Sequence, residues 1–207
     1  MEHWDNIYST KDSREVSWYR PHLHASLALI EGLELDDPSA CAVLDVGGGA
    51  SSLALDLWAR GFRDLTVLDI SARALELAQQ DCGAAAPHIR WIVGDVTRVA
   101  LPRQRYALWH DRAVFHFLAD AEREAYVGAL KASLRAGGYA IVAPFGPDGP
   151  PRCSGLAVQR YSAASLQAAL GADLRLVESR LDWHTTPSGA RQQFLYCVFR
   201  YEPAADQ

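Results

Sequence analysis

Three aspartates each stand at the end of a short apolar segment. Asp45 closes "AVLD" and precedes the glycines of "VGGGAS", Asp69 closes "DLTVLD", and Asp95 follows "RWIVG". Each segment has the length and composition of a buried strand. If the strands lie parallel and side by side, their carboxyl ends meet at one edge of a sheet, where ligands bind in such folds. Carboxylates there can accept hydrogen bonds from ribose hydroxyls, a nucleobase amino group or an ammonium.

Gly47, Gly48 and Gly49 connect the first of these strands to the helical segment that follows. Glycine lacks Cβ and adopts positive φ, so a ligand can approach the backbone closely. The start of the next helix favours a negative group such as a carboxylate. A tight turn without a ligand would use the same glycines. Asp45 would repel a pyrophosphate and suits an ammonium, which disfavours a dinucleotide phosphate at these glycines.

Three histidines are candidate general bases, because imidazole exchanges a proton near neutral pH. His110 ends "YALWH", His116 lies in "AVFHFL" and His184 lies in the turn-like "DWHTTPSGAR". Each also has a structural interpretation: His110 as a hydrogen-bond partner of a ligand or backbone, His116 as a packed helix residue, His184 as a solvated turn residue. Asp111 can orient an imidazole or cap the short helix that follows it.

Aromatic residues are concentrated in the N-terminal arm, where Trp4, Tyr8, Trp18 and Tyr19 occur within "HWDNIYSTKDSREVSWY". Aromatic faces attract a cation and exclude water. We therefore expect residues 1–35 to form an aromatic lid followed by a helix over residues 17–33. Packing of the arm onto the sheet as a hydrophobic staple is the alternative.

A second candidate lid is the glycine- and proline-rich "PFGPDGPPRCSGLAVQRYS", since long loops in compact domains are often functional. Within it, Cys153 and Arg160 are candidates for contact with a substrate, although Cys153 can equally be a plain loop thiol. Arg112, after the fourth strand, suits an anionic substrate or an ion pair with an acid such as Asp95.

The elements that position these residues alternate along the chain. Expected strands cover residues 42–46, 64–69, 89–93, 106–110 and 139–145, and expected helices cover 51–61, 71–80 and 120–134. Strands that are apolar on both faces and separated by helices predict a parallel sheet covered on both sides. Right-handed crossovers then give a three-layer, doubly wound α/β fold.

The C-terminal third has a different pattern. A helix over 162–170 is followed by strands over 174–181 and 192–201, with a loop of about ten residues and no helix between them. This predicts an antiparallel hairpin that completes a mostly parallel seven-stranded sheet. We expect one domain over residues 1–207, with a core over 42–201 and a tail over 202–207.

Composition limits the classes of partner. The chain has 207 residues and a formal net charge of −5, which disfavours extended contact with nucleic acid or an anionic membrane. The four cysteines are far apart in the sequence, so we expect no metal site, no disulfide framework and a cytoplasmic protein with reduced thiols. No apolar stretch approaches the ~20 residues of a membrane helix. A monomer and a homodimer both remain open.

"VLDVGGGAS", "VLDIS" and "GDV", in this order, resemble the cofactor motifs of class I S-adenosylmethionine-dependent methyltransferases. The "RAGGYAIVAPF" turn and strand and the closing hairpin fit the same Rossmann-like family, so the resemblance covers residues 42–201. It implies S-adenosylmethionine as cofactor and S-adenosylhomocysteine as product. It places the methionine part near Asp45, Gly47 and Gly49, the ribose at Asp69, and the adenine at Asp95 and Val96.

The complete predicted site has three groups. The expected cofactor-binding residues are Trp4, Tyr8, Trp18, Asp45, Gly47, Gly48, Gly49, Ser51, Asp69, Ile70, Asp95, Val96 and His110. The expected acceptor-binding residues are Tyr19, Arg112, Cys153, Arg160 and His184. The expected catalytic residues are His110, Asp111 and His116. Ser51 is a departure from the family, which often has glycine at that position.

The acceptor is not identified by these motifs. Residues 109–112 read Trp-His-Asp-Arg where methyltransferases of nucleobase amines commonly carry Asn/Asp-Pro-Pro-Tyr/Phe, which disfavours such amines. The spacing W-D-x-x-Y, then S-W-Y, resembles lysine methyltransferases of elongation factor and citrate synthase as well as bacterial small-molecule enzymes. We expect transfer to O, S or N of a small molecule, with a protein lysine as the alternative. A nicotinamide-dependent dehydrogenase and a non-catalytic binding module are weaker alternatives.

Overall fold

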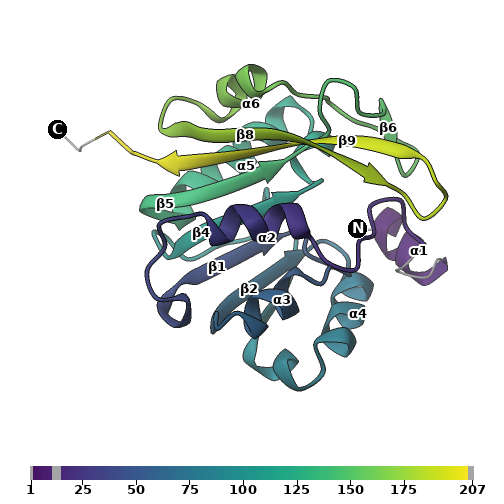
Figure 1. The fold of residues 1–207 in the computed structure, drawn as a ribbon, viewed down its shortest axis with the longest axis horizontal. Coiled ribbons are helices and arrows are strands. Elements are labelled where there is room, and N and C mark those ends of the chain that lie inside the picture. The colour runs from purple at the N-terminus through teal and green to yellow at the C-terminus, as the bar shows by residue number, and fades with distance from the viewer. Residues whose placement is uncertain (1, 11–14, 205–207) are drawn as a thin grey trace.

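The computed structural model describes residues 2–10 and 15–204 (Figure 1). In this part of the chain, seven strands form one sheet in the order β3-β2-β1-β4-β5-β9-β8. β1 to β5 pair in parallel, whereas β9 is antiparallel to both β5 and β8. The predicted doubly wound α/β sheet with a C-terminal antiparallel hairpin is confirmed.

The strands of the main sheet are β1 (Ala42–Val46), β2 (Asp64–Asp69), β3 (Arg90–Val93), β4 (Tyr106–Arg112), β5 (Leu134–Ala143), β8 (Leu174–Thr185) and β9 (Arg191–Tyr201). A separate small hairpin consists of β6 (Arg152–Cys153) and β7 (Leu156–Ala157). The α-helices are α1 (Glu2–Thr10), α2 (His24–Glu31), α3 (Leu53–Ala59), α4 (Ala72–Cys82), α5 (Asp120–Ser133) and α6 (Ala163–Leu170). Short 3-10 helices cover Pro38–Ala40, Gly83–His88 and Phe115–Phe117.

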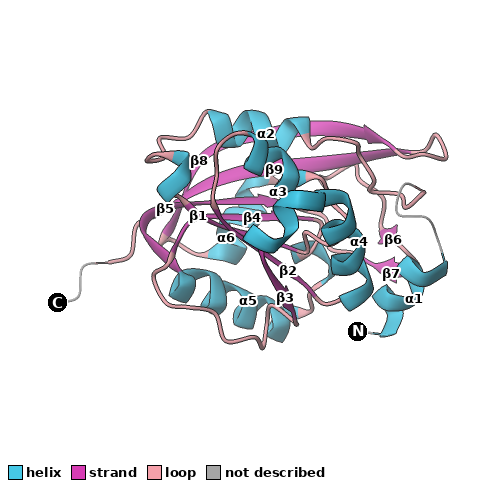
Figure 2. Cartoon of the chain, turned by 90° about the horizontal axis from the view of Figure 1, so that it is seen from below, coloured by secondary structure: helices cyan, strands magenta, loops and turns pink. Residues whose placement is uncertain are grey.

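Helices cover both faces of the sheet, so the molecule has three layers (Figure 2). On one face Leu27 of α2, Leu57 of α3 and Leu75 of α4 belong to one buried apolar cluster. On the other face Tyr126 of α5 and Leu166 of α6 belong to a second. β1 lies between the two clusters and all five of its residues are buried, which explains its continuous apolar sequence.

The N-terminal arm differs from the prediction. Its first residues form α1, which the sequence analysis did not expect, and the helix expected over 17–33 is limited to α2, His24–Glu31. Pro21 explains why the residue before it is not helical, because proline disfavours a helical conformation there. The N-cap of α2 is Leu23, two residues after Pro21. Residues 1 and 11–14 of the expected lid, and 205–207 of the expected tail, lie outside the described residues.

The C-terminal hairpin has a shorter turn than the predicted ten-residue loop. β8 extends to Thr185 and β9 begins at Arg191. The turn between them is closed by the Thr186 backbone N–H, which donates to the Ala190 carbonyl at 2.8 Å, and by Gly189 at φ +87°. The expectation of His184 in a solvated turn is therefore wrong: His184 lies in β8 and is 2% exposed.

Candidate active site

Two adjoining cavities lie where the carboxyl ends of β1, β2, β3 and β4 meet. The larger has a volume of about 280 Å³, and α1, the segment after β4 and the β6–β7 hairpin complete its walls. The smaller has a volume of about 30 Å³ and lies over the glycine loop that follows β1. Five residues line both cavities: Tyr8, Trp18, Val46, Gly47 and Arg112.

Most of the predicted site residues gather at these cavities. The large cavity is lined by Trp4, Tyr8, Trp18, Gly47, Asp69, Ile70, Asp95, Val96, Arg112 and Cys153 from the predicted set. The small cavity is lined by Tyr8, Trp18, Tyr19, Asp45, Gly47, Gly48, Ser51, His110 and Arg112 from that set. The predicted residues that line neither are Gly49, Asp111, His116, Arg160 and His184.

The glycine loop is shaped mainly by the protein's own side chains. Gly47 has φ +67°, and a Cβ there would lie 2.1 Å from Val114. A Cβ on Gly48 would lie 2.3 Å from Asp45 Oδ2, and one on Gly49 would lie 2.5 Å from Asp69 Oδ2. Carboxylates of the protein thus fill the space beside Gly48 and Gly49, which explains those two glycines without a ligand.

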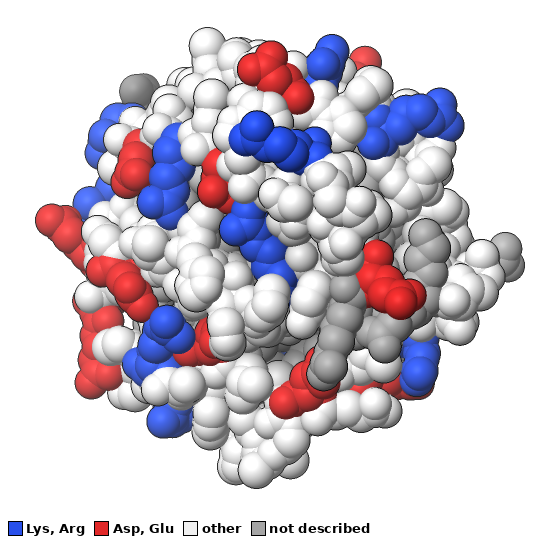
Figure 3. All heavy atoms as spheres, turned by 45° about the vertical axis from the view of Figure 1, so that its right-hand side comes forward, with Lys and Arg blue, Asp and Glu red and all other residues white. Residues whose placement is uncertain are grey.

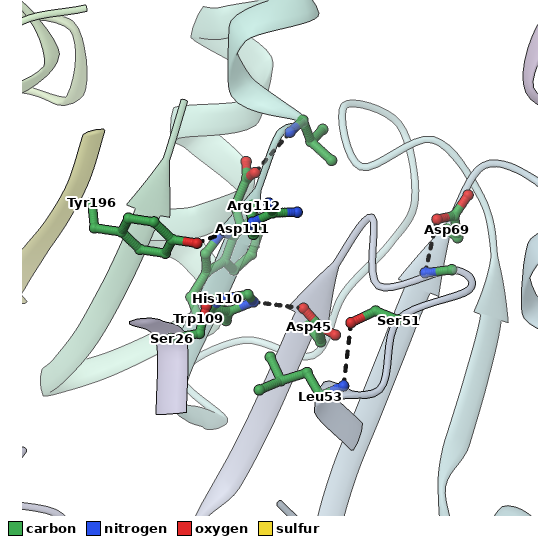
Figure 4. Close-up of polar contacts among 12 residues, drawn as sticks. Ser26, Asp45, Ser51, Leu53, Asp69, Trp109, His110, Asp111, Arg112 and Tyr196 are labelled. Atoms are coloured by element: carbon green, nitrogen blue, oxygen red, sulfur yellow. Dashed lines mark hydrogen bonds and ion pairs between the residues drawn. The ribbon is translucent and has the colours of Figure 1, made fainter. Parts of the chain in front are cut away.

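Asp45 is held by a buried chain of hydrogen bonds (Figure 4). His110 Nδ1 lies 2.7 Å from Asp45 Oδ1, and His110 Nε2 lies 2.8 Å from the Ser26 hydroxyl on α2. A carboxylate only accepts, so His110 Nδ1 donates to Asp45. Asp45 Oδ2 is buried without a hydrogen-bond partner among the described residues, and Asp45 lines the small cavity.

Asp69 of β2 and Ser51 hold the loop that follows β1 through hydrogen bonds to backbone N–H groups. The backbone N–H groups of Ser71 and Gly49 donate to Asp69 at 2.8 and 3.0 Å. Burial nevertheless raises the pKa of Asp69 to about 6, because desolvation of the carboxylate outweighs these two bonds. The Ser51 hydroxyl accepts from the Leu53 N–H at 3.2 Å at the start of α3, a contact that glycine would lack.

Asp95 accepts hydrogen bonds from residues of the loop in which it lies. Its Oδ1 accepts from the Thr97 N–H at 2.9 Å and from the Thr97 hydroxyl at 2.7 Å. Its Oδ2 lies 3.7 Å from Arg98. Within the described residues Asp95 therefore pairs with Arg98, and the alternative of an Arg112–Asp95 ion pair is not observed.

The aromatic side chains of the arm close the large cavity. Trp4 packs edge-to-face on Trp18 and Phe117, with ring centroids 5.8 and 5.1 Å apart. Trp18 Nε1 donates to the Tyr8 hydroxyl at 3.2 Å. The arm is attached to α4 by Asp5, which accepts from the Ser71 hydroxyl at 2.6 Å. The arm therefore occupies the position expected of a lid.

The expected catalytic residues have structural contacts. Both nitrogens of His110 are engaged and its side chain is 1% exposed. Asp111 is fully buried and accepts from the N–H groups of Val114 and Phe115, so it caps the 3-10 helix that follows β4. Burial raises the pKa of Asp111 to about 6. These contacts give both residues a structural role, and their part in catalysis stays a prediction.

The other two histidines are neutral and face the protein interior. His116 Nδ1 accepts from the Phe145 N–H at 3.0 Å, and burial lowers the pKa of His116 to about 3. His184 Nδ1 accepts from Arg20 Nε at 3.0 Å, and its Nε2 donates to the Ser17 carbonyl at 2.7 Å. Burial lowers the pKa of His184 to about 4. His184 thus fastens the arm to the hairpin.

Three of the expected acceptor residues have different surroundings. Arg112 donates from Nε to the Tyr196 hydroxyl and from Nη1 to the Trp18 carbonyl, both at 3.0 Å. Cys153 is 5% exposed in the wall of the large cavity, and burial raises the pKa of its thiol. Arg160 is exposed and donates to the Pro147 carbonyl at 3.0 Å, away from both cavities.

Several lining residues were not predicted from the sequence. Apolar residues of this kind are Val114, Phe117, Leu118 and Leu156 in the large cavity. They belong to short helical and loop segments whose sequence has no periodicity, so no pattern marked them. Arg20 in the small cavity had a weak signal, because it follows the aromatic pair Trp18–Tyr19.

Residues 43–138 match the model of the methyltransferase domain family. The eEF1A lysine and N-terminal methyltransferase homolog of Drosophila melanogaster is 25% identical over 124 residues, which are 59% of this chain and 18% of that protein. The chain spans about a fifth of the length of the curated relatives it matches.

Solved structures agree with this fold. A structure on the conversion of a disulfide bond into a thioacetal group during echinomycin biosynthesis has a TM-score of 0.79 and 18% identity, covering 99% of this chain and 93% of that one. The 1,6-didemethyltoxoflavin-N1-methyltransferase of Burkholderia thailandensis, with bound S-adenosylhomocysteine, has a TM-score of 0.63 and 22% identity, covering 87% of this chain and 75% of that one.

Within the described residues, every helix is too short or too polar to cross a bilayer. The cavity residues suit S-adenosylmethionine: the buried, unpartnered Asp45 Oδ2 fits an ammonium, and Asp69 and Asp95 at neighbouring strand ends fit a nucleoside. In its fold, in the domain match over residues 43–138 and in this donor set, the chain is similar to the class I S-adenosylmethionine-dependent methyltransferases.

Proposed function

We propose that the protein transfers a methyl group from S-adenosylmethionine to a small-molecule acceptor in the large cavity. The observation that carries this proposal is the aromatic cavity beside α1. Its volume of about 280 Å³ is slightly below the range of ~300–1,000 Å³ typical of small-molecule sites. Because the nucleoside of the cofactor takes part of this volume, the space that is left suits a compact acceptor.

The two cavities divide the cofactor between them in this proposal. Asp45 Oδ2 accepts from the ammonium of the methionine end in the small cavity. Asp69 accepts from the ribose hydroxyls, and Asp95 and Val96 contact the adenine, in the large cavity. Arg112 lines both cavities.

Transfer proceeds without an enzymic base in this proposal. Within the described residues, no histidine lines the large cavity. S-adenosylmethionine supplies an electrophilic methyl group on a sulfonium, so an acceptor lone pair forms the new bond while the electrons of the S–C bond return to sulfur. The protein's part is to orient the two reactants and to exclude water, and orientation supplies much of the rate in such reactions.

A protein lysine is the second candidate acceptor. It is favoured by the Drosophila melanogaster relative, whose name assigns lysine and N-terminal methylation to that protein. An extended lysine side chain would enter beneath α1. Its ammonium must lose a proton before it can react, and the three histidines described above are not placed to accept one.

Two measurements test the proposed function. Calorimetry should show binding of S-adenosylhomocysteine and no binding of NADH, and the reverse result would favour a dehydrogenase. The protein should then be incubated with methyl-labelled S-adenosylmethionine and cell extract, and the label followed in the small-molecule and protein fractions. We expect label in small molecules, whereas label only in protein would establish the lysine alternative.

A further inference from the structure

We propose that Arg112 binds an anionic group of the acceptor, and that the acceptor is therefore a small, flat, aromatic or heteroaromatic anion. This inference rests on the proposed function and specifies its substrate class. It depends on the hydrogen bonding of one guanidinium, on the charges around that guanidinium, and on the shape of the cavity beside it.

The guanidinium of Arg112 is fixed on three sides. Nε and Nη1 are bonded to the Tyr196 hydroxyl and the Trp18 carbonyl, and the group stacks over the Phe194 ring, 4.2 Å from the centroid. Nη2 is buried and has no hydrogen-bond partner among the described residues. Arg112 lines both cavities, and a donor without an acceptor in the protein is available to a ligand that reaches it.

The charge of Arg112 is also uncompensated. Among residues 2–10 and 15–204, no carboxylate lies within ion-pair distance of it, whereas the neighbouring Arg20 is paired with Asp182 at 2.8 Å. A partly buried cation without a counter-ion is unfavourable, and an incoming anion relieves that cost. Arg112 is the single cationic side chain among the described residues that line the large cavity, which is also lined by the carboxylates of Asp69, Asp95 and Glu122. An anionic acceptor is therefore favoured only beside Arg112 and away from these carboxylates.

The cofactor strengthens the preference for an anion. The sulfonium of the bound cofactor would be a second positive charge beside this apolar space. An anionic acceptor lies favourably near both cations, whereas a lysine ammonium would add a third positive charge. Like charges at short range in a low-dielectric site repel strongly.

The methionine carboxylate of the cofactor is the competing partner for Arg112 Nη2. That carboxylate has other donors nearby, because the small cavity is also lined by the glycine loop and by Arg20. Among the described residues, the large cavity has no second cationic side chain that could bind an anionic acceptor. The geometry therefore favours the acceptor as the partner of Arg112.

The remaining walls of the large cavity suit flat ligands, namely the adenine assigned to this cavity above and a planar acceptor beside it. Trp4, Trp18 and Phe117 present aromatic rings, and Leu118 and Leu156 present aliphatic surface. Aromatic walls pack closely against a planar ring. A ring nitrogen, or another atom with a free lone pair, would accept the methyl group with no proton to remove.

The probes for the test are nicotinate and nicotinamide, which have the same shape and a nucleophilic ring nitrogen but differ in charge. Binding of each is measured by calorimetry, with and without saturating S-adenosylhomocysteine. We expect the wild-type protein to bind nicotinate at least about tenfold more tightly than nicotinamide, as a charge-assisted hydrogen bond provides. Equal affinity for the two, or no binding of either at millimolar concentration, would overturn the proposal.

Variants test whether Arg112 is the group that causes the preference for nicotinate over nicotinamide. Arg112→Gln should abolish the preference for nicotinate. Arg112→Lys, which keeps the charge, and Tyr196→Phe, which removes only the hydroxyl partner of Nε, should retain a preference. A preference that persists in Arg112→Gln would contradict the assignment. Circular dichroism of each variant verifies that the fold is intact.

The affinity of each variant for S-adenosylhomocysteine is measured in parallel. We expect Arg112→Gln to bind S-adenosylhomocysteine within about threefold of wild type. A loss of tenfold or more, together with equal wild-type affinities for the two probes, would assign Arg112 to the cofactor carboxylate and overturn the proposal. Failure of wild-type protein to bind S-adenosylhomocysteine would refute the proposed function instead, and the two probes without cofactor would still decide the role of Arg112.

Discussion

At the scale of single residues, Asp45 and Asp69 are both buried at strand ends, but they are held in different ways. Asp45 is held through one oxygen by the His110 side chain, whereas Asp69 is held through both oxygens by backbone N–H groups. The orientation of Asp45 therefore depends on the side chain at position 110, whereas the orientation of Asp69 depends only on the backbone. Substitution of His110 is therefore the direct test of how Asp45 is oriented.

His110→Gln and His110→Asn separate the two hydrogen bonds of the imidazole. The Asn amide can overlie Nδ1 and still donate to Asp45, whereas the Gln amide overlies Nε2 and preserves only the contact with Ser26. We expect His110→Gln to weaken S-adenosylhomocysteine binding about tenfold, the loss of one hydrogen bond to a charged group, and His110→Asn to remain within about threefold. Calorimetry measures both, and equal losses would show that His110 only fills space.

The raised pKa of Asp69 predicts a pH dependence of cofactor binding. Ribose hydroxyls donate to the ionised carboxylate. With a pKa of about 6 in the free protein, affinity for S-adenosylhomocysteine should fall as pH decreases through 6. At pH 5 only about one molecule in ten is ionised, so binding should be about tenfold weaker than at pH 7.5. An unperturbed aspartate would instead titrate near 3.9 and leave affinity constant over this range.

Asp69→Asn is the control for that titration. The amide cannot ionise, so its weaker binding should be constant between pH 7.5 and pH 5. A decrease of similar size in the variant would assign the titration to a different group.

At the scale of elements, the lid depends on a small number of anchoring contacts. α1 is joined to the N-terminus of α4 through Asp5, which accepts from the Ser71 hydroxyl and, at 3.4 Å, from the Arg73 N–H. At the other end of the arm, Arg20 bonds to Asp182 and to His184 of the hairpin. A lid held at two ends can open at one of them while the other stays attached.

Asp5→Ala should loosen α1 without unfolding the core. We expect faster amide hydrogen exchange in Glu2–Thr10 and a dissociation rate of S-adenosylhomocysteine increased about fivefold, about 1 kcal/mol from one hydrogen bond. Asn6→Ala, an exposed position on the same helix, is the matched control and should change neither value. Unchanged exchange in Asp5→Ala would mean that the aromatic packing of Trp4 alone holds the helix.

Elements were predicted from the sequence where local signals are strong. The buried strands β1 and β2 were expected at the residues where they lie, because each is a short, mainly apolar segment that ends near an aspartate. The helix α1 of the arm was not predicted, because it is held by contacts with α4 and with residues after β4. Such contacts leave no pattern in the local sequence. The length of β8 was underestimated because its alternating exposed residues resemble a loop.

At the scale of the whole molecule, the sequence predicted which residue types gather at the site but not which of them touch. Asp45 and His110 are register partners on the adjacent strands β1 and β4, so their side chains lie on the same face of the sheet. That register depends on the packing of the entire sheet. Arg112 with Trp18 and His184 with Ser17 are likewise contacts between distant segments.

Charge is another property of the whole molecule. The formal net charge is −5, and on the face drawn in Figure 3 acidic and basic side chains are interspersed, with no extended basic area. The positive charge proposed to select the acceptor is a single guanidinium at the wall of the cavity. A surface of mixed sign leaves the selection of the acceptor to that interior group.

The attachment of the arm to the C-terminal hairpin has a consequence for biosynthesis. Arg20 leaves the ribosome early, but its partners Asp182 and His184 lie more than 160 residues later in the chain. Strands β1 to β5 can pair while the hairpin is still being translated, because they precede it in the sequence. The nascent chain can therefore anchor α1 to α4 early, through Asp5 and Ser71, but it completes the second attachment of the arm only when translation has passed β9.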